Sequence, residues 1–96
     1  MKLVLSRPAL AELDDILDYL SERSPLGAVH VEARMRRAFE HIERFPEAAE
    51  RVEQRPGVRR FPLARYPYVI YYEIADDTVT VLRILHGARR ARCAAP

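Results

Sequence analysis

The chain has 96 residues, of which 49% are hydrophobic and 31% charged, enough for one folded domain with a single core and unlike a disordered chain. Its net charge is +2, but residues 1–54 carry eight Lys and Arg against eleven Asp and Glu (−3), whereas residues 55–96 carry eight against three (+5). One cysteine, Cys93, excludes an internal disulfide, and the sequence has no secretory signal and no apolar run of membrane length. We therefore expect one cytoplasmic domain, residues 1–96, that does not bind membranes.

The first half of the chain predicts a short strand and two helices. Residues 2–6 form the strand, and Ser6 can cap the helix that follows. Leucines then recur at 3-4-3 spacing, at Leu10, Leu13, Leu17 and Leu20. Ser24 and Pro25 form a second start signal before apolar residues at 3-4-3-4-3 spacing: Ala28, Val31, Met35, Ala38, Ile42 and Phe45. Pro46 ends that helix, and the two stripes predict a helical hairpin with both stripes in the core.

The second half predicts three strands, residues 58–63, 68–74 and 78–86, after an irregular or briefly helical connection over 47–57. The fold is then α+β, in the order β-α-α-β-β-β, with a small antiparallel sheet packed against the helical hairpin. A turn at Asp76 and Asp77 predicts the facing pairs Ile74–Val79, Tyr72–Val81, Ile70–Arg83 and Tyr68–Leu85 on one face, and Tyr71–Leu82 and Val69–Ile84 on the other. The hairpin covers one face, so we expect an open apolar patch on the other.

Arginine dominates the basic residues, since fifteen of the sixteen are arginine and Lys2 is the only lysine. A guanidinium grips carboxylates and phosphates but is a poor proton donor, which favours binding over acid–base chemistry. Arg83 is unusual because it interrupts an apolar strand, and a buried guanidinium requires a partner. We expect it either to reach the rim of the sheet or to meet a carboxylate, such as Glu73 or one from another chain.

Other chemistry finds little support. His30 and His41 lie on one predicted helix about 16 Å apart along its axis, too far to share a metal ion. No Cys-x-x-Cys spacing, catalytic triad pattern or phosphate loop occurs. Along the first helix, Asp14, Asp18 and Glu22 step by four with Glu12 and Asp15 beside them. We interpret these as a solvated face, with a docking stripe for a basic partner as the alternative. We expect no metal and no cofactor.

Four blocks in this order resemble the RelE/ParE superfamily of type II toxin–antitoxin toxins, and its ParE branch more closely: "ALAELDDILDYLSERSP" (9–25), "FPE" (45–47), "GVRRFPLARYPYVIYYEI" (57–74) and "VTVLRILHGAR" (79–89). The resemblance extends to about Arg90. It implies a small α/β sheet with a helical hairpin, and a cognate ParD-like antitoxin whose C-terminal segment wraps the toxin. ParE-like toxins inhibit DNA gyrase, whereas RelE-like toxins cut mRNA on the ribosome. Operator DNA would be contacted only through the antitoxin.

The RelE-type nuclease pattern is mostly absent. An ungapped match places its middle-strand arginine on Val69 and its C-terminal tyrosine on Ala95, and its paired lysines on Arg60 and Pro62. Only the arginine after the glycine is kept, as Arg89. Cleavage by attack of the 2′-hydroxyl requires proton transfers, for which arginine is a poor substitute.

The sequence thus predicts a ParE-like toxin that inhibits gyrase and is not an enzyme, with a ParD-like antitoxin as partner. Two alternatives stay open: a ribosome-dependent mRNA endonuclease, for which His86 and the middle-strand tyrosines are the near candidates, and a non-toxic antitoxin-binding regulatory module. We expect no catalytic residue, a flexible tail over about 91–96, and a cationic rim that contacts target or antitoxin through Arg59, Arg60, Arg65, Arg83, His86, Arg89 and Arg90.

Overall fold

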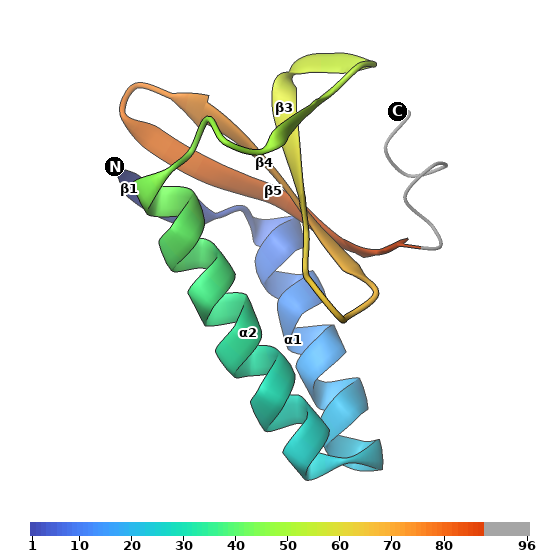
Figure 1. The fold of residues 1–96 in the computed structure, drawn as a ribbon. Helices are drawn as coiled ribbons and strands as arrows, with labels where there is room; N and C mark the ends of the chain where they lie inside the picture. The colour runs from blue at the N-terminus through green and yellow to red at the C-terminus, as the bar shows by residue number, and fades with distance from the viewer. Residues whose placement is uncertain (88–96) are drawn as a thin grey trace.

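The computed structural model describes residues 1–87 and combines two helices with five strands (Figure 1). Arg89, Arg90 and the expected tail over 91–96 lie outside the described residues. The elements are β1 (Lys2–Leu5), α1 (Arg7–Arg23), α2 (Pro25–Arg44), β2 (Glu50–Val52), β3 (Arg55–Pro62), β4 (Tyr68–Ala75) and β5 (Thr78–His86). The strands form one sheet in the order β1-β5-β4-β3-β2, and the α1–α2 hairpin packs against one face of it. None of the described helices is long and apolar enough to cross a membrane.

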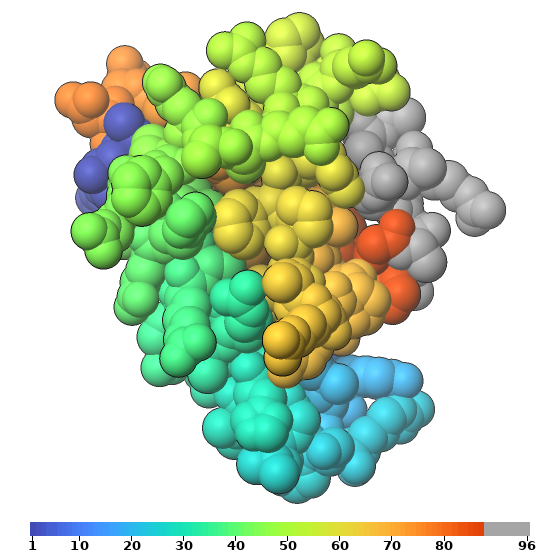
Figure 2. All heavy atoms as spheres, in the orientation of Figure 1, coloured from blue at the N-terminus to red at the C-terminus, as the bar shows by residue number. Residues whose placement is uncertain are grey.

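Both helices begin where the cap residues predict. The Ser6 hydroxyl accepts a hydrogen bond from the Ala9 N–H at 3.2 Å, and the Ser24 hydroxyl accepts one from the Gly27 N–H at 3.0 Å. These bonds satisfy helix N–H groups that have no partner within the helix. The hairpin therefore follows from short-range signals, and its closed end projects beyond the sheet (Figures 1 and 2).

The predicted stripe of α2 is correct in its centre, that of α1 is only partly buried at Leu13 and Leu17, and each is wrong at one end. Met35 and Ile42 are buried, whereas Leu10 and Phe45 are each 52% exposed. In the first turn of α1 the fully buried residue is Ala9. Ser6, which caps this turn, also donates a hydrogen bond to the Leu82 carbonyl at 2.9 Å. This bond holds the turn close to β5, where a small side chain fits. Phe45 is the residue that caps α2, with non-helical φ and ψ of −133° and 64°, so the helical period does not extend to it.

The sheet is mixed rather than purely antiparallel. β1 runs parallel to β5, from the pair Lys2 and Thr78 to the pair Leu5 and Val81, and the other neighbouring strands are antiparallel. This pairing joins segments far apart in the chain, and nothing local in either segment specifies its direction. β2 is a further difference, because it pairs with β3 inside the connection that was expected to be irregular or helical.

A β-bulge changes the register of the central hairpin. The predicted pairs Ile74–Val79 and Tyr72–Val81 are present. Beyond them Leu82 is an extra residue on β5, so that Tyr71 faces Arg83; the remaining predicted pairs are therefore wrong, since Ile70 faces Ile84, Val69 faces Leu85 and Tyr68 faces His86. Because an extra residue reverses the alternation of side chains, Arg83 leaves the hairpin-facing side of the sheet. Ile84 takes the buried position there instead.

Each face of the sheet carries a buried apolar cluster. The larger one, between sheet and hairpin, comprises Ala9, Val31, Met35, Ala38, Ile42, Leu63, Ile70, Tyr72, Val79, Val81 and Ile84. The smaller one, on the face away from the hairpin, comprises Val52, Val58, Val69, Tyr71 and Leu85. The residues of this second cluster are buried, so this face differs from the open patch that was expected. Arg60 and Arg83 are the cross-strand neighbours of Tyr71, and the aliphatic stems of arginine cover apolar surface.

Candidate partner-binding site

Arg83 meets a carboxylate, which is one of the two expected alternatives, but the partner is Glu12 of α1 rather than Glu73. The Glu12 Oε2 atom accepts hydrogen bonds from Arg83 Nε at 2.8 Å and from Nη2 at 2.5 Å. The side chains are 43% exposed for Arg83 and 21% for Glu12. Glu12 had been assigned to a solvated face, and the contact joins residues 71 positions apart. No local signal in the sequence could have identified it.

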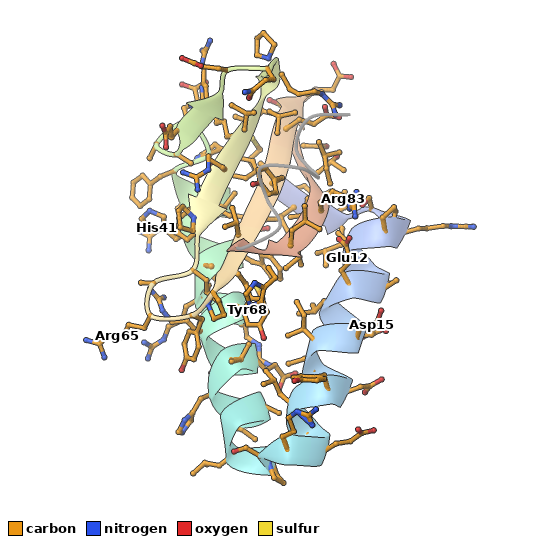
Figure 3. All side chains as sticks on the ribbon, turned by 90° about the vertical axis from the view of Figure 1, so that its right-hand side faces the viewer. Glu12, Asp15, His41, Arg65, Tyr68 and Arg83 are labelled. Carbon is orange, nitrogen blue, oxygen red and sulfur yellow. The ribbon has the colours of Figure 1, made fainter. Side chains whose placement is uncertain are left out.

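A groove of about 520 Å³ lies beside this ion pair, between α1 and the ends of β4 and β5. Figure 3 shows Glu12 and Arg83 adjacent near the start of α1, with Asp15 farther along the helix and Tyr68 on the facing strand. The groove is lined by Glu12, Asp15, Ile16, Tyr19, Tyr68, Arg83, Ile84, Leu85 and His86. Its walls combine apolar side chains, aromatic rings and charges of both signs, a mixture suited to holding a segment of another protein.

Two aromatic contacts shape the walls of this groove. The Tyr68 and His86 rings meet edge to face with centroids 5.9 Å apart, and the Arg23 guanidinium lies 4.2 Å from the centre of the Tyr19 ring. Burial raises the pKa of the Tyr68 hydroxyl, and the charge on Tyr19 adds to the shift. Tyr68 is thus neutral at physiological pH and offers a hydroxyl and an aromatic face, not an ionised base.

Arg59 lies away from the groove and is used inside the fold. Its Nη1 atom donates hydrogen bonds to the carbonyls of Glu47 at 3.0 Å and Ala49 at 2.8 Å. The neighbouring Tyr72 hydroxyl donates to the Pro46 carbonyl at 2.7 Å. Together they hold the segment between α2 and β2 against the sheet. Arg59 therefore has a structural role, and its contact with a partner stays a prediction.

Arg60 and Arg65 occupy two further places. Arg60 donates from Nη1 to Glu50 Oε1 at 3.0 Å, and its Nε atom is buried without a hydrogen-bond partner among the described residues. Arg65 is exposed in the turn between β3 and β4, with a φ of 73°, and Figure 3 shows its side chain pointing outward. Of the predicted contact residues within 1–87, the structure therefore brings only Arg83 and His86 to one groove.

Tyr71 and Tyr72 are neighbours on β4, and comparing them tests how much the Tyr72 hydrogen bond contributes to stability. The Tyr72 hydroxyl is bonded to Pro46, whereas the buried Tyr71 hydroxyl has no hydrogen-bond partner among the described residues. A net hydrogen bond contributes about 1 kcal/mol, and an unpaired buried hydroxyl costs about 1–3 kcal/mol. Tyr72→Phe should therefore lower the free energy of unfolding by about 1 kcal/mol, whereas Tyr71→Phe should leave it unchanged or raise it. Urea denaturation of both variants measures the difference; equal losses would mean that the Tyr71 hydroxyl is also bonded.

Burial also raises the pKa of the Tyr72 hydroxyl, and the nearby Arg59 guanidinium offsets part of the shift.

Within residues 1–87, no three His, Cys, Asp or Glu side chains gather in a way that could hold a metal ion. The groove brings Glu12, Arg83, Tyr68 and His86 together beside apolar side chains, an arrangement suited to binding a segment of another protein.

Comparison with known proteins finds toxins of toxin–antitoxin systems that match most of the chain. The family model described as the ParE toxin of the type II toxin–antitoxin system parDE matches residues 3–91. The protein "Toxin RelE2" of Caulobacter vibrioides is 37% identical over 81 residues, covering 84% of this chain and 89% of the relative. A solved structure described as the "Chromosomal ParDE TA system from P. aeruginosa" superposes with a TM-score of 0.79 at 26% identity, covering 90% of this chain and 95% of the other.

Proposed function

Because the chain belongs to the ParE toxin family of type II toxin–antitoxin systems, we propose that it inhibits DNA gyrase. It acts in the cytoplasm, and a ParD-like antitoxin neutralises it. The toxin acts by binding and not by catalysis. One observation favours an inhibitor over a nuclease: Val69 stands where a RelE-type nuclease has an arginine. Val69 is 5% exposed and packs in the second apolar cluster, so the sheet offers no cation at that position.

The antitoxin is proposed to bind in the groove between α1 and the ends of β4 and β5. A peptide segment would bury its apolar side chains on Ile16, Tyr19 and Tyr68, which line the groove and keep exposed surface. The donors of Arg83 and the hydroxyls of the groove tyrosines would meet its carbonyl and carboxylate groups. The solved ParDE system supports the existence of such a partner for a toxin of this fold.

A ribosome-dependent mRNA endonuclease is the second candidate. It is favoured by one observation, the 37% identity to a protein named toxin RelE2. In that case His86, which lines the groove and packs edge to face on Tyr68, would be the acid or base. The two candidates differ in what a single substitution at His86 does.

Induction of the chain in bacteria without its antitoxin tests the proposal. Growth should stop with induction of the DNA-damage response while protein synthesis continues at first. His86→Gln should retain most of the toxicity because no proton is transferred. If Arg83 of the cationic rim also contacts gyrase, Arg83→Ala should weaken toxicity through lost charge-assisted hydrogen bonds to the target, about 1.5–3 kcal/mol at most. Immediate loss of translation, abolished by His86→Gln in a folded protein, would favour the endonuclease. Continued growth would favour a non-toxic antitoxin-binding module.

A further inference from the structure

β5 is longer than β1, its parallel neighbour in the sheet. β1 ends with the pair Leu5 and Val81, but β5 continues to His86. The final residues of β5 therefore form an edge on the β1 side, and an uncovered edge presents main-chain N–H and C=O groups that need partners. The groups that bond this edge in place of β1 therefore also form one wall of the groove.

Side chains from the N-terminal half of α1 and its cap replace the missing strand. The Ser6 hydroxyl donates to the Leu82 carbonyl at 2.9 Å, and the Ile84 N–H donates to Glu12 Oε1 at 2.8 Å. Glu12 thus satisfies a main-chain donor that a longer β1 would otherwise satisfy. This seals the β5 edge at the point where it enters the groove.

The second oxygen of the same carboxylate holds Arg83. Oε2 accepts from both Nε and Nη2 of the guanidinium, which fixes its plane and direction. A flexible arginine loses side-chain freedom when a partner binds it, whereas one held in advance loses less. The 43% exposure of Arg83 leaves part of its surface available while it is held in this way.

We propose that Glu12 is a positioning residue for partner recognition, holding Arg83 in the orientation in which it contacts the antitoxin segment. The inference rests on the proposed function, because it takes that segment to bind in the groove. The ion pair compensates the charge of Arg83, so recognition depends on the direction of its donors more than on net charge. The partner group is a hydrogen-bond acceptor of the peptide, a main-chain carbonyl or a carboxylate.

Glu12→Gln separates positioning from sealing the edge. The glutamine amide presents one oxygen and one NH2 group where Glu12 has two oxygens, so that with its oxygen on the Ile84 N–H it turns an NH2 donor toward Arg83. The bidentate contact that fixes the Arg83 guanidinium is then lost, whereas the bond that seals the β5 edge is kept. Because a released charge can also attract an acidic partner at long range, affinity is measured at about 1 M salt, where the Debye length is about 3 Å. Glu22→Gln is the matched control, since Glu22 is an exposed glutamate elsewhere on α1.

The experiment measures binding of a purified ParD-like antitoxin, the proposed partner. At high salt, Glu12→Gln should weaken affinity by about two- to tenfold, the factor that ordering one released side chain costs, and Glu22→Gln should not. In an Arg83→Ala background the same Glu12→Gln change should have no further effect. An equal loss in both backgrounds, or a loss that only follows a lowered melting temperature, would overturn the positioning role.

The failures of the two proposals give different results. If the wild-type chain does not bind this antitoxin, the proposed partner is wrong and the inference is overturned with it. If the wild type binds and Arg83→Ala weakens binding but Glu12→Gln does not, only the role of Glu12 is overturned.

Discussion

Replacing Ile42 by alanine should lower the free energy of unfolding by about 2–5 kcal/mol. Ile42 is fully buried in the cluster between sheet and hairpin. The change removes three carbons and leaves a cavity that neighbouring side chains on α2 and the sheet can fill only in part. For a small domain whose total stability is about 5–15 kcal/mol, this is the largest single effect that we expect.

Leu10→Ala is the matched control for Ile42→Ala, because Leu10 is 52% exposed although the sequence pattern places it in the core stripe. Its loss should be within about 0.5 kcal/mol, as for surface substitutions. Urea unfolding of both variants, fitted with a common slope, measures the two values. A large loss for Leu10 with a small one for Ile42 would mean that the helices are rotated relative to the sheet.

Arg59→Ala should lower the free energy of unfolding by about 1.5–3 kcal/mol, because it removes a charged donor from two carbonyls. The carbonyls of Glu47 and Ala49 lose their bonds, and the segment between α2 and β2 is released from the sheet. Loss of toxicity should then follow the loss of folded protein. If Arg59 were instead a contact for the target, the variant would keep its melting temperature and lose inhibition.

Arg65→Ala provides the comparison for Arg59. Arg65 is exposed and lies in the turn between β3 and β4, so its replacement should change the free energy of unfolding by no more than about 0.5 kcal/mol. Any loss of toxicity in that variant would report a contact and not a fold defect. Thermal denaturation and growth arrest, measured on both variants, separate the two roles.

The hairpin was predictable because its signals are local. Ser6 and Ser24 cap helices through hydrogen bonds to residues three positions away, and Met35 and Ile42 follow a period set by helix geometry. The antiparallel pairing of the two long strands was also predictable near their two-residue turn. At Asp76 and Asp77, both with positive φ, that turn fixes the first pairs.

The bulge and the site were not predictable, because each depends on contacts that are distant in sequence. The extra residue Leu82 is accommodated where Ser6 binds its carbonyl, 76 positions away, and no pattern within β5 marks it. The apolar residues around Arg83 indicated that it either reaches the rim of the sheet or meets a carboxylate. Which carboxylate, and that Glu12 would also bind the Ile84 N–H, follows only from the docking of α1 on the sheet.

Whether the chain inhibits gyrase is measured with purified protein, folded and free of antitoxin, in two parallel reactions. In the first, DNA gyrase supercoils relaxed plasmid with increasing amounts of toxin; in the second, ribosomes hold mRNA in the presence of the same amounts. We expect that supercoiling is inhibited in proportion to bound toxin, equally by wild type and His86→Gln, and that the mRNA stays intact. Cleaved ribosome-bound mRNA with unimpaired supercoiling would contradict it.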